Sequence, residues 1–162
     1  MARRVLTDAS PLIGLARVDG LPWLRTLVGT VWLPSEVYAE VLSGRKLPDV
    51  QTIDKALADG YLQLCDPTPP IPTLPELDAG ETACIRHALL STPPALILID
   101  ERAGRAIARE HNIPVTGTAA IIGMAKLRGL IPSAREVFTH LHASDFRISA
   151  TVIETILKKT GE

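Results

Sequence analysis

The stretch that decides the fold is "LILIDERAGRAIA", residues 96–108. Four apolar residues run directly into two adjacent acids, Asp100 and Glu101, and a helix-like pattern with two arginines follows. A continuous apolar run is typical of a parallel strand that is buried on both faces. The stretch therefore predicts a buried strand over 94–100 and a helix over 101–112, with the two acids at the junction.

The same alternation of strand and helix runs along the whole chain. Apolar runs predict short strands at 5–7, 30–34, 61–66, 94–100 and 113–118. Periodic patterns with N-cap, proline and glycine signals predict helices at 10–18, 20–29, 34–44, 48–59, 77–91, 101–112, 119–130, 132–144 and 148–161. The proline-rich segment 67–78 predicts a loop. This order predicts an α/β fold, with a mostly parallel sheet of four to five strands covered by helices on both faces.

Length and composition restrict the possible functions. A chain of 162 residues suits one domain with a proper core. The formal net charge of −1 gives no global basic field for nucleic acid. Cys65 and Cys84 lie in apolar patterns without metal spacing, which indicates buried free thiols in a reducing cytosol. No apolar segment is long enough to span a bilayer, and no signal peptide is visible, so we expect a cytoplasmic protein without a membrane segment.

Acidic and hydroxyl side chains follow the predicted strands. The first strand ends at Asp8, shortly before Ser10, the fourth ends at Asp100 and Glu101, and the fifth ends in the turn 116–118. Ligands of open α/β sheets bind outside the carboxyl ends of the strands. Carboxylates gathered there repel one another, and a divalent cation such as Mg²⁺ or Mn²⁺ compensates. The site type fits metal-dependent phosphodiester cleavage.

Alternative α/β enzymes fit this sheet edge less well. No glycine-rich phosphate loop follows the first strand, which argues against a dinucleotide or P-loop enzyme. A response regulator gathers acids at strand ends, but it has an acid pair after its first strand and a lysine after its last. Here the first strand delivers only Asp8.

Two predicted helices carry further acids. Glu81 follows Asp78 by three positions, so Glu81 either completes a capping box with Asp78 as the N-cap or is part of the site. Glu36 and Glu40 are four apart and share one helix face. We interpret Glu36 as a favourable charge in the first turn. From the residues alone, a solvated surface acid is the favoured interpretation of Glu40.

Five motifs in the same order carry a family resemblance. They are "TDASPLIGLARV" (7–18), "LPSEVYAEVL" (33–42), "AGETACIRHA" (79–88), "LILIDERAGRAIA" (96–108) and "IPVTGTAAIIGMAKLRGLI" (113–131). Together they resemble the PIN-domain nucleases, and most closely a PIN-like branch related to VapC-type toxins of toxin–antitoxin pairs. The resemblance covers roughly residues 3–131. It implies a three-layer α/β/α sandwich and one PIN-like domain over 1–162, with 132–162 as a C-terminal helical extension.

The resemblance also implies an acidic cluster that binds Mg²⁺ or Mn²⁺ and cleaves RNA. Matched position by position, it assigns catalytic roles to Asp8, Glu40, Glu81 and Asp100. Asp8 and Asp100 are expected to hold the metal. Glu40 and Glu81 bind it or orient the attacking water, and Glu81 is counted among the ligands. The match therefore favours a functional interpretation of Glu40 and Glu81 over the structural one.

The chain departs from the wider family after the fifth strand. Many PIN domains carry a further acid there, whereas the turn "VTGTAA" (115–120) has none. Thr116 and Thr118, together with Ser10, are candidates to hold a phosphate oxygen. Glu101 either compensates for the missing acid or is a charge at a helix N-terminus. The missing acid motivates a second hypothesis, in which the PIN fold has lost catalysis and binds RNA or protein as a regulatory module.

The leading hypothesis is a metal-dependent endoribonuclease, the toxin of a toxin–antitoxin pair, with a small antitoxin and a second copy of the chain as expected partners. Arg102, Arg105 and Lys126 are candidate contacts to RNA phosphates, and each is equally well explained as a solvated charge. The apolar helix 148–161 could form a dimer interface, although packing on the core is favoured. The histidines, which fit no metal spacing beyond the isolated HLH pair, are interpreted as surface or helix-end residues: His87, His111, His140 and His142.

Overall fold

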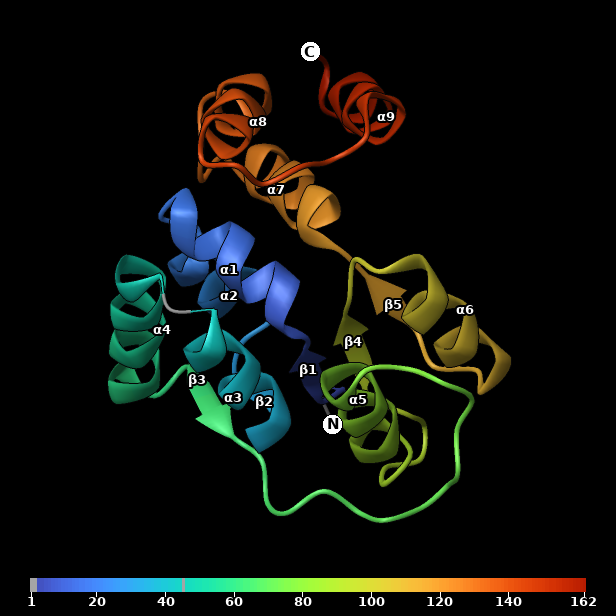
Figure 1. The fold of residues 1–162 in the computed structure, drawn as a ribbon. Helices are drawn as coiled ribbons and strands as arrows, with labels where there is room; N and C mark the ends of the chain where they lie inside the picture. The colour runs from blue at the N-terminus through green and yellow to red at the C-terminus, as the bar shows by residue number, and fades with distance from the viewer. Residues whose placement is uncertain (1–2, 45) are drawn as a thin grey trace.

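The computed structural model describes residues 3–44 and 46–162, whose five strands form one parallel sheet (Figure 1). The strands are β1 (Val5–Thr7), β2 (Val31–Leu33), β3 (Leu62–Leu64), β4 (Leu96–Leu98) and β5 (Val115–Thr116). Their order across the sheet is β3-β2-β1-β4-β5, and every neighbouring pair is parallel. The prediction of a parallel α/β sandwich is confirmed.

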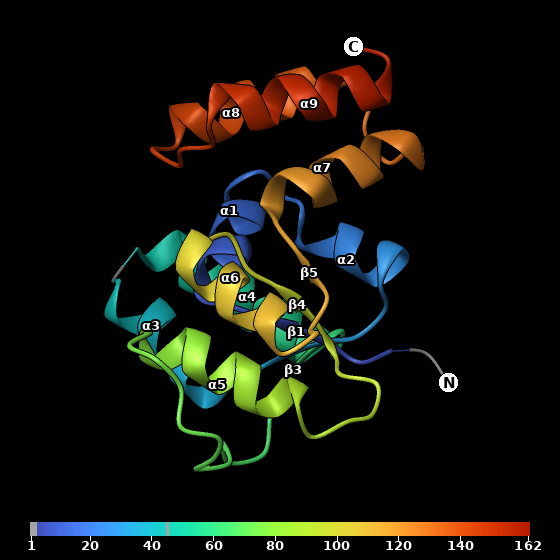
Figure 2. The same ribbon diagram turned by 90° about the vertical axis from the view of Figure 1, so that its right-hand side faces the viewer.

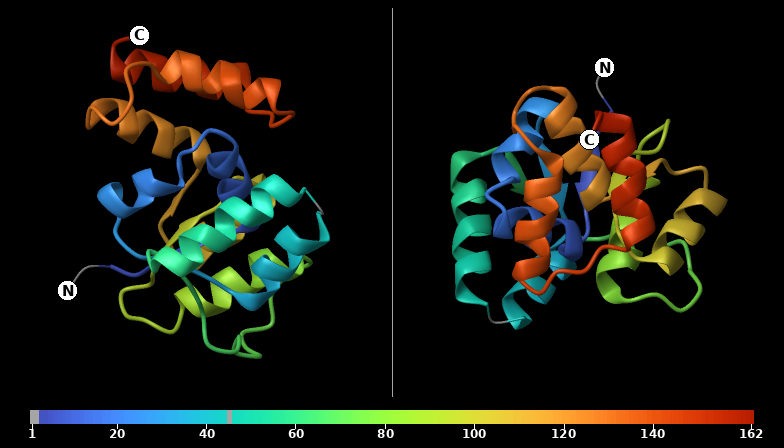
Figure 3. Two further views of the ribbon diagram at one scale, coloured as in Figure 1. Left: turned by 90° about the vertical axis from the view of Figure 1, so that its left-hand side faces the viewer. Right: turned by 90° about the horizontal axis from the view of Figure 1, so that it is seen from above.

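Helices cover both faces of this sheet and flank its edges. They are α1 (Ala9–Arg17), α2 (Leu21–Leu27), α3 (Ser35–Ser43), α4 (Leu47–Asp59), α5 (Ala79–Ala88), α6 (Arg102–Glu110), α7 (Thr118–Leu127), α8 (Ala134–Ala143) and α9 (Ala150–Thr160). Figure 2 shows α1, α2 and α7 on one side of the strands and α3 and α5 on the other. Seen from above, α4 and α6 lie at opposite ends of the molecule (Figure 3). Each predicted strand and helix is present, although the strands pair over only two or three residues.

The core of the sheet is made by the central strands. Leu6, Val31 and Ile97 are all fully buried, as expected for strands covered on both faces. The register of β1 on β4 pairs Thr7 with Leu98. Both strands therefore end at the same edge of the sheet, where their acidic successors emerge.

The C-terminal helices pack on α7, at some distance from the sheet (Figures 1 and 2). Leu157 of α9 is buried, and Ile153 and Ile156 pack against the core. A Cβ at Gly123 of α7 would lie 2.9 Å from Ile156 Cγ2, so the two helices approach closely there. Helix α9 thus packs on the core of its own chain, as the favoured interpretation expects.

His87 is a helix-end histidine, as one of the two interpretations expects, because it lies in the last turn of α5. It is nevertheless buried rather than at the surface. Its Nε2 lies 3.1 Å from Thr68 Oγ1, which donates a hydrogen bond to Glu36 Oε1 over 2.8 Å. The proline-rich loop brings Thr68 back onto α3 and α5, a long-range contact that helix position alone does not indicate. Cys84 is buried and Cys65 half-buried, and both are free thiols.

None of the helices in the described ranges is both long enough and apolar enough to cross a membrane.

Candidate metal centre

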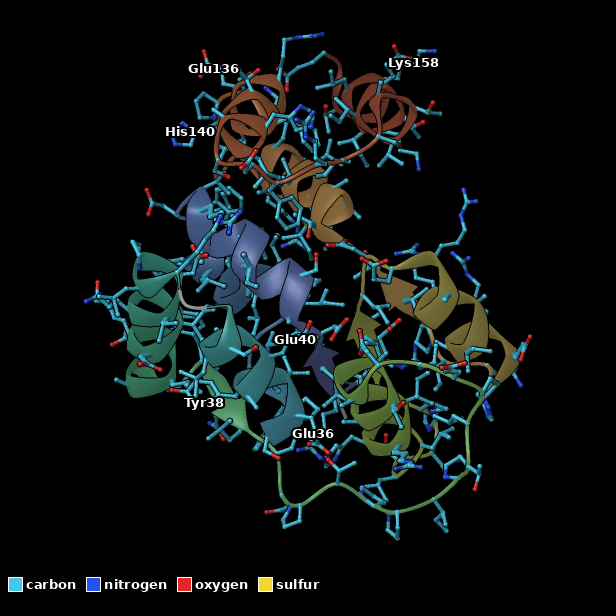
Figure 4. All side chains as sticks on the ribbon, viewed as in Figure 1. Glu36, Tyr38, Glu40, Glu136, His140 and Lys158 are labelled. Carbon is cyan, nitrogen blue, oxygen red and sulfur yellow. The ribbon has the colours of Figure 1, made fainter. Side chains whose placement is uncertain are left out.

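Three carboxylates from separate elements converge at the edge of the sheet. Asp8 follows β1, Glu40 lies in α3 and Asp78 is the N-cap of α5. One carboxylate oxygen from each lies within 4.8 Å of the others. Asp8 is buried, whereas Glu40 and Asp78 are exposed, so the group is open to solvent on one side. In Figure 4, Glu40 extends from α3 toward the region where β1, β4 and α5 meet.

A glycine in the first turn of α5 leaves room for this convergence. A Cβ at Gly80 would lie 2.8 Å from Asp8 Oδ1 and 3.0 Å from Glu40 Oε2. Both distances are shorter than ordinary van der Waals contact. The two oxygens therefore face the same spot above the backbone of α5, and a side chain at Gly80 would push them apart.

The protein leaves the inner oxygen of this group without a partner. Asp8 Oδ1 is buried and accepts no hydrogen bond within residues 3–44 and 46–162. Burial raises the pKa of Asp8 to about 7, and a hydrogen bond from the Ala9 N–H offsets part of this rise. The charges of Asp78, Glu40 and Glu81 raise it further. A buried, unpaired carboxylate is unfavourable unless a cation or a proton compensates it.

The pKa values of Glu40 and Glu81 are raised as well. Burial raises the pKa of Glu40, and the charges of Asp78 and Glu101 add to the rise. Burial likewise raises the pKa of Glu81 to about 7, followed by its hydrogen bond and charge interaction with Asp78. Glu101 is an exposed N-cap residue of α6 and makes no side-chain capping bond. Its charge nevertheless reaches both Glu40 and Glu81, so it belongs to the same electrostatic group.

Asp78 and Glu81 form the capping box that their spacing predicts. Asp78 Oδ1 accepts a hydrogen bond from the Glu81 N–H over 2.8 Å, and the Asp78 N–H donates to Glu81 Oε1 over 3.4 Å. Glu81 Oε2 is buried and has no hydrogen-bond partner among the described residues. It lies against α6, where a Cβ at Gly104 would overlap it. The acid of this pair that joins Asp8 and Glu40 is thus Asp78. Sequence reasoning considered it only as a cap, although the motif "DAGE" contains it.

Asp100 has the opposite environment to Asp8. Its Oδ2 accepts hydrogen bonds from Ser10 Oγ over 3.1 Å and from Thr118 Oγ1 over 2.7 Å. Its Oδ1 accepts one from the Thr118 N–H over 2.8 Å. These bonds tie the starts of α1 and α7 to the end of β4.

The strand register places Asp8 and Asp100 at different levels along their neighbouring strands. Thr7 pairs with Leu98, and the Asp8 N–H donates to the Leu98 carbonyl over 2.9 Å. Asp8 is therefore level with Ile99, one residue before Asp100. The expected ligands were Asp8, Asp100 and Glu81. The closest carboxylate group in the described chain shares only Asp8 with that set.

Three of the remaining predicted site residues lie near the end of β4, and one lies elsewhere. Ser10 and Thr118 contact Asp100, and Thr116 lies in β5 beside Leu98. Lys126 Nζ instead donates to the Pro132 carbonyl over 2.7 Å, near the far end of α7.

A cleft of about 510 Å³ begins beside the acidic edge, at Asp100 and Glu101. The predicted phosphate contacts Arg102 and Arg105 line it, whereas Lys126 does not. The Arg105 guanidinium donates from Nη1 to the Ile99 carbonyl over 2.9 Å.

A buried carboxylate with an unpaired oxygen, flanked by further acids beyond the strand ends of a parallel sheet, defines an α/β domain suited to a hard divalent cation. Comparison with known families agrees with this class. A family model described as a PIN domain matches residues 4–162, so the chain belongs to the PIN-domain family, whose members are generally metal-dependent nucleases. No curated protein matches the chain.

Proposed function

We propose that this protein is a metal-dependent endoribonuclease that uses Mg²⁺ or Mn²⁺ to cleave RNA phosphodiester bonds. The observation that carries the proposal is the buried Asp8 Oδ1, which has no partner in the described chain and faces Glu40 across Gly80. Such an oxygen fits a cation ligand better than a structural group, because buried structural carboxylates have their hydrogen bonds satisfied.

Asp8, Glu40 and Asp78 are the residues that would hold the ion, since all three offer an oxygen within the same small space. Oxygen donors suit Mg²⁺ and Mn²⁺. When bound, a divalent ion supplies positive charge for the phosphodiester and acidifies water. Glu81 fixes the backbone of Asp78 through the capping box, and its charge adds to the field at the site.

Asp100 has a different role in this proposal. Its hydrogen bonds to Ser10 and Thr118 hold its carboxylate at the mouth of the cleft. A carboxylate oxygen has two acceptor sites, so Oδ1 keeps one for a water molecule. Asp100 then orients water or substrate there, and it reaches the ion through water rather than directly. Glu101, beside it, supplies negative charge that the turn after β5 lacks.

The test is cleavage of a panel of structured RNAs with Mg²⁺ or Mn²⁺ present, with DNA of the same sequences in parallel. We expect RNA cleavage that EDTA abolishes and that both Asp8→Asn and Asp100→Asn reduce. Asp59→Asn, an exposed acid at the end of α4, is the matched control and should cleave like the wild type. Unchanged RNA cleavage by both Asp8→Asn and Asp100→Asn would contradict the proposed nuclease function.

We further propose that the protein is a cytoplasmic, homodimeric toxin with a small cognate antitoxin. This rests on the sequence resemblance to the VapC-related branch, which also suggests one PIN-like domain with 132–162 as its extension. Induced expression in a bacterium should arrest growth. Asp8→Asn or co-expression of a small neighbouring gene should relieve the arrest. Growth unaffected by the active protein would contradict the toxin role, and sedimentation as a monomer would contradict the dimer.

A non-catalytic PIN module that binds RNA or protein is the second candidate. It is favoured by the turn after β5, where Thr116 and Thr118 stand without an acid. Calorimetric titration discriminates between the two candidates. Absence of Mn²⁺ binding at millimolar concentration, with the fold intact by circular dichroism, would favour the module.

A further inference from the structure

The segment between β3 and α5, residues 66–77, is a proline-rich strap that is fastened to the rest of the fold at several points. It passes around α5 and ends at Asp78, the N-cap of that helix (Figure 1). The Arg86 guanidinium donates from Nε to the Pro72 carbonyl over 3.0 Å. Two leucines of the strap pack against the core: Leu74 and Leu77. The strap therefore joins the C-terminal part of α5 to a carboxylate of the candidate metal centre.

A chain of three polar side chains fastens the start of the strap. Thr68 Oγ1 lies 2.8 Å from Glu36 Oε1 of α3 and 3.1 Å from His87 Nε2 of α5. In Figure 4, Glu36 lies on the side of α3 that faces α5. Burial raises the pKa of Glu36, but the hydrogen bonds that it accepts outweigh this effect and lower the pKa. The carboxylate is therefore ionised and acts only as an acceptor.

The ionised carboxylate determines the direction of these hydrogen bonds. Thr68 has one hydroxyl proton, and the shorter contact, to the charged Glu36 oxygen, takes it. The Thr68 oxygen can then only accept from the imidazole. Nε2 of His87 must therefore carry the proton of the neutral ring.

The groups around His87 favour its neutral form. Burial lowers the pKa of His87, and the Arg4 guanidinium just before β1 lowers it further. The carboxylates of Glu36 and Asp66 raise this pKa but do not compensate. Two further titratable groups of this layer are thiols kept neutral by burial, which raises their pKa: Cys65 and Cys84. His87 therefore takes up a proton more readily when the strap opens and exposes the ring to water.

We infer that Glu36, Thr68 and His87 form a latch that holds the strap closed and thereby keeps the Asp78 carboxylate at the metal centre. Thr68 and His87 are then positioning residues, which act on the ion only through the strap. The inference rests on the proposed function, because it takes Asp78 as a metal ligand. It also makes the strap sensitive to acid, since an open strap lets His87 bind a proton.

The latch is tested by hydrogen–deuterium exchange of strap peptides in the full chain at about pH 8 in EDTA. Thr68→Val keeps the shape of the side chain but loses both hydrogen bonds, so it should raise the exchange rate of the strap about tenfold. Thr68→Ser keeps the hydroxyl and should stay within about threefold of wild type. The matched control is Thr139→Val, which removes an exposed hydroxyl bound to the Arg135 carbonyl of α8. Equal exchange in Thr68→Val and Thr139→Val would overturn the latch.

The link to the metal centre is tested by adding Mn²⁺ to the same exchange experiment. Opening of the strap removes Asp78 from the ion, so Mn²⁺ at about 100 times its Kd should slow strap exchange at least about tenfold. Asp78→Asn at the same Mn²⁺ concentration should show at most about twofold protection. Mn²⁺ that binds the wild type without slowing strap exchange overturns the link to Asp78. Absence of any Mn²⁺ binding, with exchange that still depends on Thr68, overturns the proposed function but not the latch.

The direction of the hydrogen bonds has a spectroscopic test in the wild type. Long-range proton–nitrogen correlation spectra at about pH 8 should show a neutral His87 ring with its proton on Nε2. A ring proton on Nδ1 would overturn the chain of bonds, because Thr68 would then donate to His87 instead of Glu36.

The role of His87 is tested by the pH dependence of strap exchange in EDTA, corrected for the intrinsic exchange rate. The lowered pKa of His87 means that the proton binds the open strap better, so stability of the closed strap is present above about pH 6.5 and lost below it. Exchange should rise by up to about tenfold between about pH 7.5 and pH 5.5. His87→Gln keeps an N–H donor without titrating and should lack this rise, whereas His140→Gln, exposed on α8, should keep it. An equal rise in wild type and His87→Gln would overturn the role of His87.

Discussion

Asp8 and Asp100 follow adjacent parallel strands at the same edge of the sheet, yet the protein treats them in opposite ways. Asp8 is buried, and its Oδ1 has no hydrogen-bond partner in the part of the chain that the structure describes. Its pKa is raised to about 7. Asp100 accepts three hydrogen bonds from Ser10 and Thr118. Both look alike in the sequence, because each is the first acid after a short strand-like run.

The difference separates two uses of a carboxylate. A satisfied acid such as Asp100 fixes the surrounding backbone, since three hydrogen bonds from the chain already occupy most of its acceptor sites. An unsatisfied acid such as Asp8 costs folding free energy, and such groups are concentrated at functional sites. We therefore assign direct cation binding to Asp8 and its neighbours and a positioning role to Asp100.

The largest expected effect is that of Asp8→Asn on cleavage. Removing the inner carboxylate should lower the rate of RNA cleavage by about 1,000-fold or more, equivalent to about 4 kcal/mol. Asp100→Asn should lower it about tenfold, because the amide keeps hydrogen-bonding partners for Ser10 and Thr118 but loses the charge. Single-turnover rates at saturating Mn²⁺ measure both. A larger loss in Asp100→Asn than in Asp8→Asn would reverse the comparison.

The pH dependence should show the raised pKa of Asp8. Below about pH 7 a proton occupies the site, so Mn²⁺ affinity should rise about tenfold between about pH 6 and pH 8 if the proton on Asp8 competes, and about 100-fold if the proton on Glu81 competes as well. The same proton stabilises the metal-free fold at low pH, and this stability is lost as the pH rises from about 4 through about 7. Calorimetry and thermal melts in EDTA measure these trends.

The control for the pH effect is Asp8→Asn, which carries no titrating carboxyl at that position. It should lose less stability than wild type over the same pH range, by up to about 4 kcal/mol. Identical stability curves for the two proteins would show that Asp8 is not strained in the metal-free state.

Asp100→Ala should destabilise the fold by about 1–3 kcal/mol, because it leaves the N–H and hydroxyl of Thr118 without an acceptor. Thr118 is fully buried, so water cannot replace that acceptor. Asp100→Asn should cost less than about 1 kcal/mol. Urea denaturation measures both changes. Equal stability of Asp100→Ala and wild type would remove the positioning role.

The smallest effects are expected from alanine substitutions at two glycines, Gly80 beside Asp8 and Gly117 beside Asp100. Gly80→Ala places a methyl group against Asp8 and Glu40 and should weaken Mn²⁺ binding about tenfold, although alanine favours the helix by up to about 1 kcal/mol. In Gly117→Ala the new Cβ would lie 2.7 Å from Asp100 Oδ1. Its Mn²⁺ affinity should stay within about twofold of wild type. Equal losses of Mn²⁺ affinity in Gly80→Ala and Gly117→Ala would contradict the separate roles of Asp8 and Asp100.

The sequence predicts the parallel sheet and the acids at its edge because local patterns determine them. The apolar run before Asp100 and the short run before Asp8 are visible without tertiary information. The capping box of Asp78 and Glu81 is equally local, since it depends on a spacing of three residues. Glu40 required the family resemblance, because its helix alone favours a surface acid.

The remaining features depend on packing between distant segments. The register of β1 on β4 decides that Asp8 is level with Ile99 rather than Asp100. The placement of α5 over that edge then decides that Asp78 faces Asp8. Thr68 meets His87 only because the strap folds back onto α3 and α5. Spacing in the sequence carries no signal for such contacts.

The most direct test of the account is calorimetric Mn²⁺ titration of four proteins at about pH 8. These are the wild type, Asp8→Asn, Asp78→Asn and Asp100→Asn. Asparagine is a good N-cap, so Asp78→Asn should keep helix α5 intact. We predict that Asp8→Asn and Asp78→Asn each bind Mn²⁺ at least about 100-fold more weakly than the wild type, whereas Asp100→Asn binds within about threefold. Loss of binding in Asp100→Asn as large as in Asp8→Asn, or full binding in Asp8→Asn, would contradict the account.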